Sequence, residues 1–151
     1  MTTDLISLVI HSLGSSIKNV TRLKLGNVTV HPSTLTMFIG HFPHLDDLSI
    51  SVVGLPMTLE GTGDSHRDFL GEIITTHPRG KFSASGIPVY QVPKIFKAIT
   101  LLEPRFHRVT LDFDSYGSWR IYWPLIGACA GSLEELQILT DATGERTHLD
   151  L

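Results

Sequence analysis

The sequence predicts an α/β fold of five helix–strand units that share a short parallel sheet. Two observations lead to this prediction: a six-residue apolar pattern recurs along the chain, and a helix-like stretch precedes each copy. Short strands that alternate with helices and brief connections favour parallel strands joined by crossover helices. Apolar residues occupy relative positions 1, 4 and 6 of the pattern, whose copies are VTRLKL (20–25), LDDLSI (45–50), FSASGI (82–87), FHRVTL (106–111) and LEELQI (133–138).

The spacing of these copies favours a one-sided solenoid over a doubly wound sheet. The copies start at 20, 45, 82, 106 and 133, and three of the four separations (25, 24 and 27 residues) lie in the range of leucine-rich repeats. The remaining separation, 37 residues, contains a glycine- and proline-rich insertion loop at 52–64. Position 4 of the third copy is Ser85, and no copy has the usual Asn at position 9. We therefore expect a degenerate leucine-rich-repeat-like solenoid that forms one domain over 1–151.

The predicted elements follow from apolar periodicity and from proline and glycine positions. Pro93 suits the first turn of a helix, whereas Pro124 predicts a kink or a late helix start. Gly131 is placed to end the last helix. Strands are expected near 20–26, 45–51, 81–87, 106–112 and 133–139, and helices near 4–13, 33–41, 65–77, 92–102 and 118–130.

Composition and charge narrow the classes of function. With 42% hydrophobic and 18% charged residues, the chain is typical of a folded domain. Its net charge of −3 and the lack of a basic stripe argue against nucleic-acid binding. No apolar run reaches the length of a membrane span. The single cysteine, Cys129, indicates a reducing compartment, so we expect an intracellular protein, cytoplasmic or nuclear.

Three segments carry a family resemblance: FPHLDDLSI (42–50), SGIPVYQVPKIFKAITLLEPRFHRVTLDF (85–113) and LIGACAGSLEELQI (125–138). They resemble the C-terminal leucine-rich-repeat-like region of F-box-type proteins of mushroom-forming fungi. The resemblance covers most of the chain and implies a region that captures a protein partner, while an F-box would dock the adaptor of a ubiquitin ligase. No F-box-like segment is found ahead of residue 20. The resemblance therefore does not imply that this chain docks the adaptor. One hypothesis is that the chain is a fragment of a longer protein.

The strand pattern also predicts a polar surface. Positions 3 and 5 of each copy should face away from the core, on the concave side of the sheet. In register, Arg22 would lie beside Asp47 and Arg108 beside Glu135. The small residues Ala84 and Gly86 of the third copy would leave a shallow dip. The candidate partner-binding residues are Arg22, Lys24, Asp47, Ser49, Arg108, Thr110, Glu135 and Gln137.

Two interpretations of this surface remain open at the level of sequence. The charges could simply pair and keep an exposed sheet soluble, each pair contributing under about 1 kcal/mol. They could also form a binding surface for a protein, since solenoids use this face for partners. The two interpretations are compatible, and the first hypothesis is a non-enzymatic protein-interaction module.

The segment HFPHLDD (41–47) raises a different hypothesis, a small hydrolase or metal-dependent enzyme that uses His41, His44 and Asp46. The repeat instead predicts that Leu45 points inward while Asp47 points to the opposite face, so that these groups diverge. Their spacing also fits zinc-ligand patterns poorly. We therefore expect no catalytic residue, metal or cofactor. A third hypothesis is a truncated fragment without independent function.

Two further groups invite a functional interpretation. Cys129 lies on an apolar helix face, which predicts a small core residue rather than a nucleophile. Trp119, Tyr122 and Trp123 form an aromatic cluster that predicts helix packing, with an exposed aromatic as an alternative anchor for a partner.

Overall fold

Spatial order follows chain order in the sheet of this protein. We describe the fold from a computed structural model, for residues 11–27, 29–51, 76–113, 119–140 and 146–150. Within these ranges six strands form one sheet in the order β1-β2-β3-β4-β5-β6. The first five are parallel to one another, and β6 is antiparallel to β5. The strands are β1 (Arg22–Gly26), β2 (Asp47–Ser51), β3 (Lys81–Ser85), β4 (Arg108–Phe113), β5 (Glu135–Thr140) and β6 (Arg146–Asp150). The predicted α/β class with a parallel sheet is confirmed.

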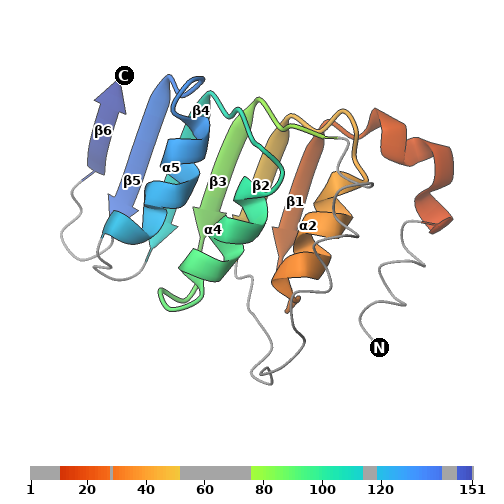
Figure 1. The fold of residues 1–151 in the computed structure, drawn as a ribbon, viewed down its shortest axis with the longest axis horizontal. Helices are drawn as coiled ribbons and strands as arrows, with labels where there is room; N and C mark the ends of the chain where they lie inside the picture. Colours follow the sequence, from red (N-terminus) through yellow and green to blue (C-terminus); the bar gives the residue numbers. More distant parts are fainter. Residues whose placement is uncertain (1–10, 28, 52–75, 114–118, 141–145, 151) are drawn as a thin grey trace.

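The described helices cover one face of the sheet. Figure 1 shows α2, α4 and α5 in front of the same sheet face. In this part of the chain no helix is long and apolar enough to cross a membrane. The helical elements are η1 (Gly14–Asn19), α2 (Pro32–Gly40), α4 (Val92–Thr100), η2 (Trp119–Tyr122) and α5 (Trp123–Cys129), where η denotes a 3₁₀ helix.

Proline sets the start of three of these helices. Pro32, Pro93 and Pro124 each occupy one of the first two positions of their helix. Proline is accepted there because the first backbone N–H groups of a helix have no partner within it. The late start predicted at Pro124 is confirmed, and a 3₁₀ turn, η2, fills the residues before it. At α2, the His31 side chain caps the helix by accepting a hydrogen bond from the Ser33 N–H.

Other predicted elements differ from the structure or lie outside it. Of the helix predicted at 4–13, residues 4–10 lie outside the described residues and 11–13 are helical, followed by the 3₁₀ helix η1. Most of the helix predicted at 65–77 and all of the insertion at 52–64 lie outside the described residues. Residues 76–77 are not helical. Strand β6 is not predicted from the sequence, because RTHLD (146–150) does not repeat the apolar pattern and pairs with β5 in the opposite direction.

The core lies between the helices and the inward face of the sheet. Phe82 and Phe106 from the strand side meet Phe96 of α4, with ring centroids 5.2 Å apart for Phe82–Phe106 and 6.0 Å for Phe82–Phe96. Tyr122 extends the cluster, 6.1 Å from Phe96. All four side chains are almost completely buried. Aromatic rings remove large apolar areas from water, so this cluster contributes much of the stability of the middle of the domain.

A buried hydroxyl joins two neighbouring helices. Thr36 of α2 is fully buried, and its Oγ1 lies 2.9 Å from the carbonyl oxygen of Ala98 in α4. Ala98 is in the last turn of α4, where carbonyls lack partners within the helix. The threonine therefore satisfies a buried acceptor and fixes the relative position of the two helices.

Backbone hydrogen bonds repeat at the start of the parallel strands. The carbonyl of Thr21 accepts the N–H groups of Asp46 and Asp47, at 2.8 and 3.0 Å. The same arrangement recurs for the Gly80 carbonyl with His107 and Arg108, and for the His107 carbonyl with Glu134 and Glu135. One carbonyl thus accepts the N–H groups of the first residue of the next strand and of the residue before it, which fixes the register between the two strands.

Candidate functional site

The sheet face opposite the helices carries two rows of polar side chains, which we call the open face. Its rows follow from strand alternation: in β2, Leu48 and Ile50 are buried whereas Asp47 and Ser49 are partly exposed. Strand pairing aligns equivalent positions side by side. The first row is Arg22, Asp47, Lys81, Arg108 and Glu135, and the second row is Lys24, Ser49, Ser83, Thr110 and Gln137.

Both predicted ion pairs of the open face are confirmed. Arg22 Nε lies 3.2 Å from Asp47 Oδ2, and Arg108 Nε lies 3.0 Å from Glu135 Oε2. In each pair the arginine is the more exposed partner, at 83% for Arg22 and 54% for Arg108. Exposed pairs of this kind contribute at most about 1 kcal/mol, so their main effect is to fix side-chain orientation.

The predicted dip at Ala84 and Gly86 is wrong. Ala84 is 1% exposed and pairs in register with the buried Ile50 and Leu111, so it belongs to the core. Gly86 follows the end of β3 with a φ of 60°, where the chain leaves the sheet. The third copy was misplaced by three residues: position 1 is Arg79, and positions 3 and 5 are Lys81 and Ser83.

Lys81 and Ser83 are open-face residues that were not predicted from the sequence. The pattern RGKFSA (79–84) resembles the next copy, FHRVTL (106–111), in having a basic residue at position 3 and apolar residues at positions 4 and 6. Starting at 79, the third unit lies 27 residues before the fourth, which equals the separation of the fourth from the fifth. Spacing was therefore the signal that could have placed it. The exposed Arg79 at position 1 concealed the match.

Asp47 is held from two sides. Its Oδ2 contacts Arg22, and its Oδ1 accepts a hydrogen bond of 2.8 Å from the backbone N–H of Lys81. The side chain thus links β1, β2 and β3. Asp47 is therefore a structural acceptor as well as a surface charge, which makes Arg108 the cleaner position for a charge reversal.

The segment HFPHLDD forms the junction between α2 and β2. His41 follows the helix, and its Nδ1 is 2.6 Å from the carbonyl oxygen of Met37. Leu45 is buried, as predicted, whereas His44 and Asp46 are exposed. His41 is thus engaged with its own helix while His44 and Asp46 lie beyond the turn. Within the described residues no group of three or more His, Cys, Asp or Glu side chains could hold a metal ion.

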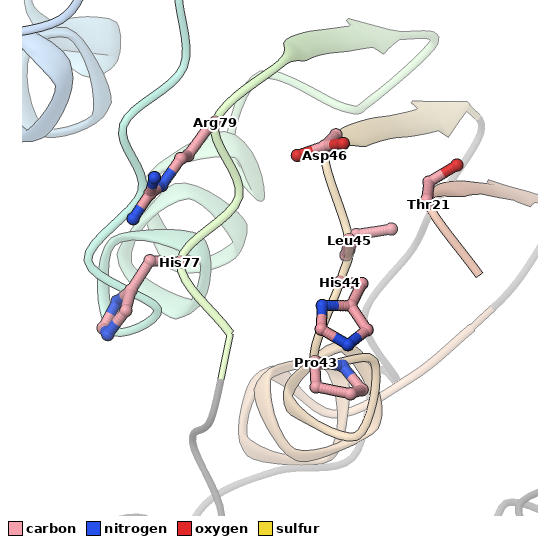
Figure 2. A pocket seen from close by; sticks show the side chains of 7 residues that line it. All are labelled: Thr21, Pro43, His44, Leu45, Asp46, His77 and Arg79. Carbon is pink, nitrogen blue, oxygen red and sulfur yellow. The ribbon is translucent and has the colours of Figure 1, made fainter. Parts of the chain in front are cut away.

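His44 and Asp46 do share a pocket at the edge of the sheet where the strands begin. The pocket has a volume of about 350 Å³, and Figure 2 shows the side chains that line it. His77 and Arg79 project from the segment before β3, across the pocket from His44. His77 Nδ1 lies 3.0 Å from the Leu102 carbonyl, outside the pocket lining. The two charged residues of this pocket, Asp46 and Arg79, are exposed to solvent.

Cys129 is a core residue, as predicted. Its side chain is fully buried, and Sγ lies 3.8 Å from the carbonyl oxygen of Pro104. Burial raises the pKa of the thiol, and a backbone hydrogen bond at Phe106 lowers it by less. A buried thiol with a raised pKa holds little thiolate and is a poor nucleophile.

This raised pKa predicts a pH dependence of stability. Above the ordinary value of 9.0 the unfolded chain loses the thiol proton while the folded protein keeps it. The folded state then binds more protons, so the free energy of unfolding falls as pH rises toward the folded-state pKa. We expect Cys129→Ala to reduce this fall between about pH 8 and about pH 10, measured by urea unfolding. If the free energy of unfolding fell equally with pH in Cys129→Ala and in the wild type, the raised pKa of the Cys129 thiol would be contradicted.

The aromatic cluster divides between packing and exposure. Tyr122 is 4% exposed, and burial raises the pKa of its phenol. Trp123, the next residue, is 58% exposed at the start of α5. Packing is therefore confirmed for Tyr122, whereas Trp123 matches the exposed alternative. The Trp119 side chain lies outside the described part of the structure.

No family model, curated protein or solved structure matches this chain. Function must therefore be argued from the fold and from the open face.

Proposed function

We propose that this chain is a non-enzymatic protein-interaction module, a degenerate leucine-rich-repeat-like solenoid that binds a protein partner on the open face. The observation that carries the proposal is the asymmetry of the sheet. The described helices lie on one face, whereas the other presents two rows of polar side chains over five consecutive strands. Surfaces of this kind are used by repeat proteins for partners.

The repeat character is supported by unit length and backbone contacts. With the corrected third unit, the starts are 20, 45, 79, 106 and 133, and the last three units are evenly spaced by 27 residues. The carbonyl that accepts the N–H groups at the start of the next strand, from its first residue and the residue before it, occupies position 2 in three of these units, at Thr21, Gly80 and His107. Equivalent sequence positions therefore make equivalent contacts, as expected of stacked repeats.

The distribution of polar groups favours a macromolecular partner. Charged and hydroxyl side chains spread along the whole open face, from Arg22 in β1 to Glu135 in β5. Small ligands are usually bound in deep, mostly apolar cavities. An extended row of exposed polar groups instead suits the polar contacts of a protein interface. The resemblance to fungal F-box-type proteins adds that the partner would be a captured client, and the proposal does not extend to adaptor docking.

Charge reversal at Arg108 tests this function. We expect Arg108→Glu to weaken partner capture by roughly tenfold, equivalent to about 1.4 kcal/mol, because it places a second carboxylate beside Glu135. The full chain, immobilised through an affinity tag, is incubated with lysate, and captured proteins are quantified by mass spectrometry. The free energy of unfolding in urea is expected to change by under about 1 kcal/mol, because the lost Arg108–Glu135 ion pair is exposed.

Arg105→Glu is the matched control, since this exposed arginine precedes β4 and lies outside the open-face rows. It should leave capture at the wild-type level. Equal capture by all three proteins, or equal loss in both variants, would contradict the proposed function.

A further inference from the structure

The open face is hollowed near its β1 end. A shallow depression of about 290 Å³ spans β1, β2 and β3. Leu23 and Leu48 take part in its lining, together with six residues of the two rows: Arg22, Lys24, Asp47, Ser49, Lys81 and Ser83. Three of these residues are cations, one is a carboxylate and two are serines. The depression therefore differs from the predicted dip, which was placed at two small residues of the third unit.

The single carboxylate of the lining is already engaged. Asp47 Oδ2 lies 3.2 Å from Arg22 Nε, and Asp47 Oδ1 accepts the Lys81 backbone N–H at 2.8 Å. Both oxygens are thus used, and the charge of Asp47 offsets that of Arg22. Neither contact involves the ammonium group of Lys24 or Lys81.

Lys24 and Lys81 are the other two cations of the depression. Both are exposed, and neither forms an ion pair with a carboxylate in the described part of the chain. In the register of the sheet, Lys24 stands opposite Ser49, and Ser49 stands opposite Ser83. Among the residues that the structure describes, the depression thus carries two ammonium groups without a carboxylate partner, beside neutral hydroxyl groups, in a chain whose net charge is −3.

We propose that this depression binds an acidic segment of the protein partner, with an Asp or Glu carboxylate placed between Lys24 and Lys81. The inference rests on the proposed function and names the chemistry of its partner. Ammonium and hydroxyl groups both donate hydrogen bonds to carboxylates, and those from ammonium are charge-assisted.

Charge complementarity selects a short acidic peptide segment over a long polyanion. Toward β4 and β5 the open face is balanced, because Arg108 pairs with Glu135. Asp112 of β4 adds a partly exposed carboxylate on the same side of the sheet. A nucleic acid running along the face would meet these carboxylates, whereas a peptide acid confined to the β1–β3 end would not.

Fluorescence anisotropy with a fluorescein-labelled hexaglutamate peptide tests the inference on the full chain. We expect binding at low salt that weakens as ionic strength rises, because the contacts are solvent-exposed charges. The double variant Lys24→Gln/Lys81→Gln should bind at least tenfold more weakly. The matched control is Lys94→Gln/Lys97→Gln, which removes two exposed lysines of α4, and it should bind as the wild type does.

Three results would overturn the inference: no hexaglutamate binding by the wild type, equal weakening in both double variants, or equally tight binding of a labelled oligothymidylate. Partner capture separates this inference from the function on which it rests. If Arg108→Glu loses capture while Lys24→Gln/Lys81→Gln keeps it, the interaction module stands and the acidic-segment inference fails. If both variants keep capture, both proposals fail.

Discussion

Replacing Phe82 with alanine is expected to lower the free energy of unfolding by about 3–5 kcal/mol, the usual cost of removing a buried phenylalanine ring. Phe82 is 1% exposed and lies at the centre of the domain, in the middle strand of the parallel sheet. Its ring contacts those of Phe96 and Phe106. The variant therefore loses apolar burial and leaves a cavity against two rigid rings, which have little freedom to fill it.

Urea unfolding monitored by circular dichroism measures this change. Phe38→Ala in α2 is the matched control, because Phe38 is only partly buried and contacts one ring, that of Phe42, 5.3 Å away. Phe38→Ala should lower the free energy of unfolding by clearly less than Phe82→Ala does. A loss under about 1 kcal/mol for Phe82→Ala would contradict the placement of this residue in the core.

Replacing Gly80 with alanine is expected to lower the free energy of unfolding by about 1–3 kcal/mol, because there is no space for the added methyl group. A Cβ at this position would overlap Asp47 Oδ1 and would lie 3.1 Å from the backbone carbon and oxygen of Asp46. The backbone cannot move away easily. The Gly80 N–H donates to the Asp46 carbonyl at 3.0 Å, and the Gly80 carbonyl accepts from His107 at 3.0 Å.

The substitution should also displace the Asp47 carboxylate and so weaken its contacts with Arg22 and with the Lys81 N–H. Urea unfolding gives the energetic effect, and amide hydrogen exchange at Lys81 reports the lost hydrogen bond. Gly127→Ala in α5 is the control, since nothing lies within 4 Å of its added Cβ. It should be neutral or stabilising by up to about 1 kcal/mol. Equal stability of Gly80→Ala and wild type would show that the Asp47 side chain does not occupy this position.

The register of strands on the open face could be predicted from the sequence wherever the start of each repeat was placed correctly. Arg22 and Asp47 occupy the same position of consecutive units, and in-register parallel strands place such positions side by side. The same holds for Arg108 and Glu135. These contacts depend only on the alternation of side chains along a strand and on the residue at which each copy of the pattern starts. Both can be recognised from the apolar residues of the sequence.

The third unit could not be placed from the same pattern, for a physical reason. Phe82 and Ile87 are both buried, so FSASGI matches the ends of the repeat. However, Gly86 takes a positive φ after the strand, and Ile87 reaches the core from beyond the sheet. Ala84, the real inward residue, is too small to stand out as part of an apolar pattern. Lys81 and with it the depression were therefore missed.

The reversed direction of β6 has a consequence for self-association. A parallel sheet built from stacked units exposes, at its end, a strand edge onto which another copy could add its own first strand in the same direction. Contacts of that head-to-tail kind do not close on themselves and can extend into filaments. In this protein the outer edge of β5 is already occupied by β6, which runs the opposite way. A second molecule that approached β5 to continue the parallel sheet would meet a strand of the wrong polarity, so we expect β6 to disfavour head-to-tail association at this edge.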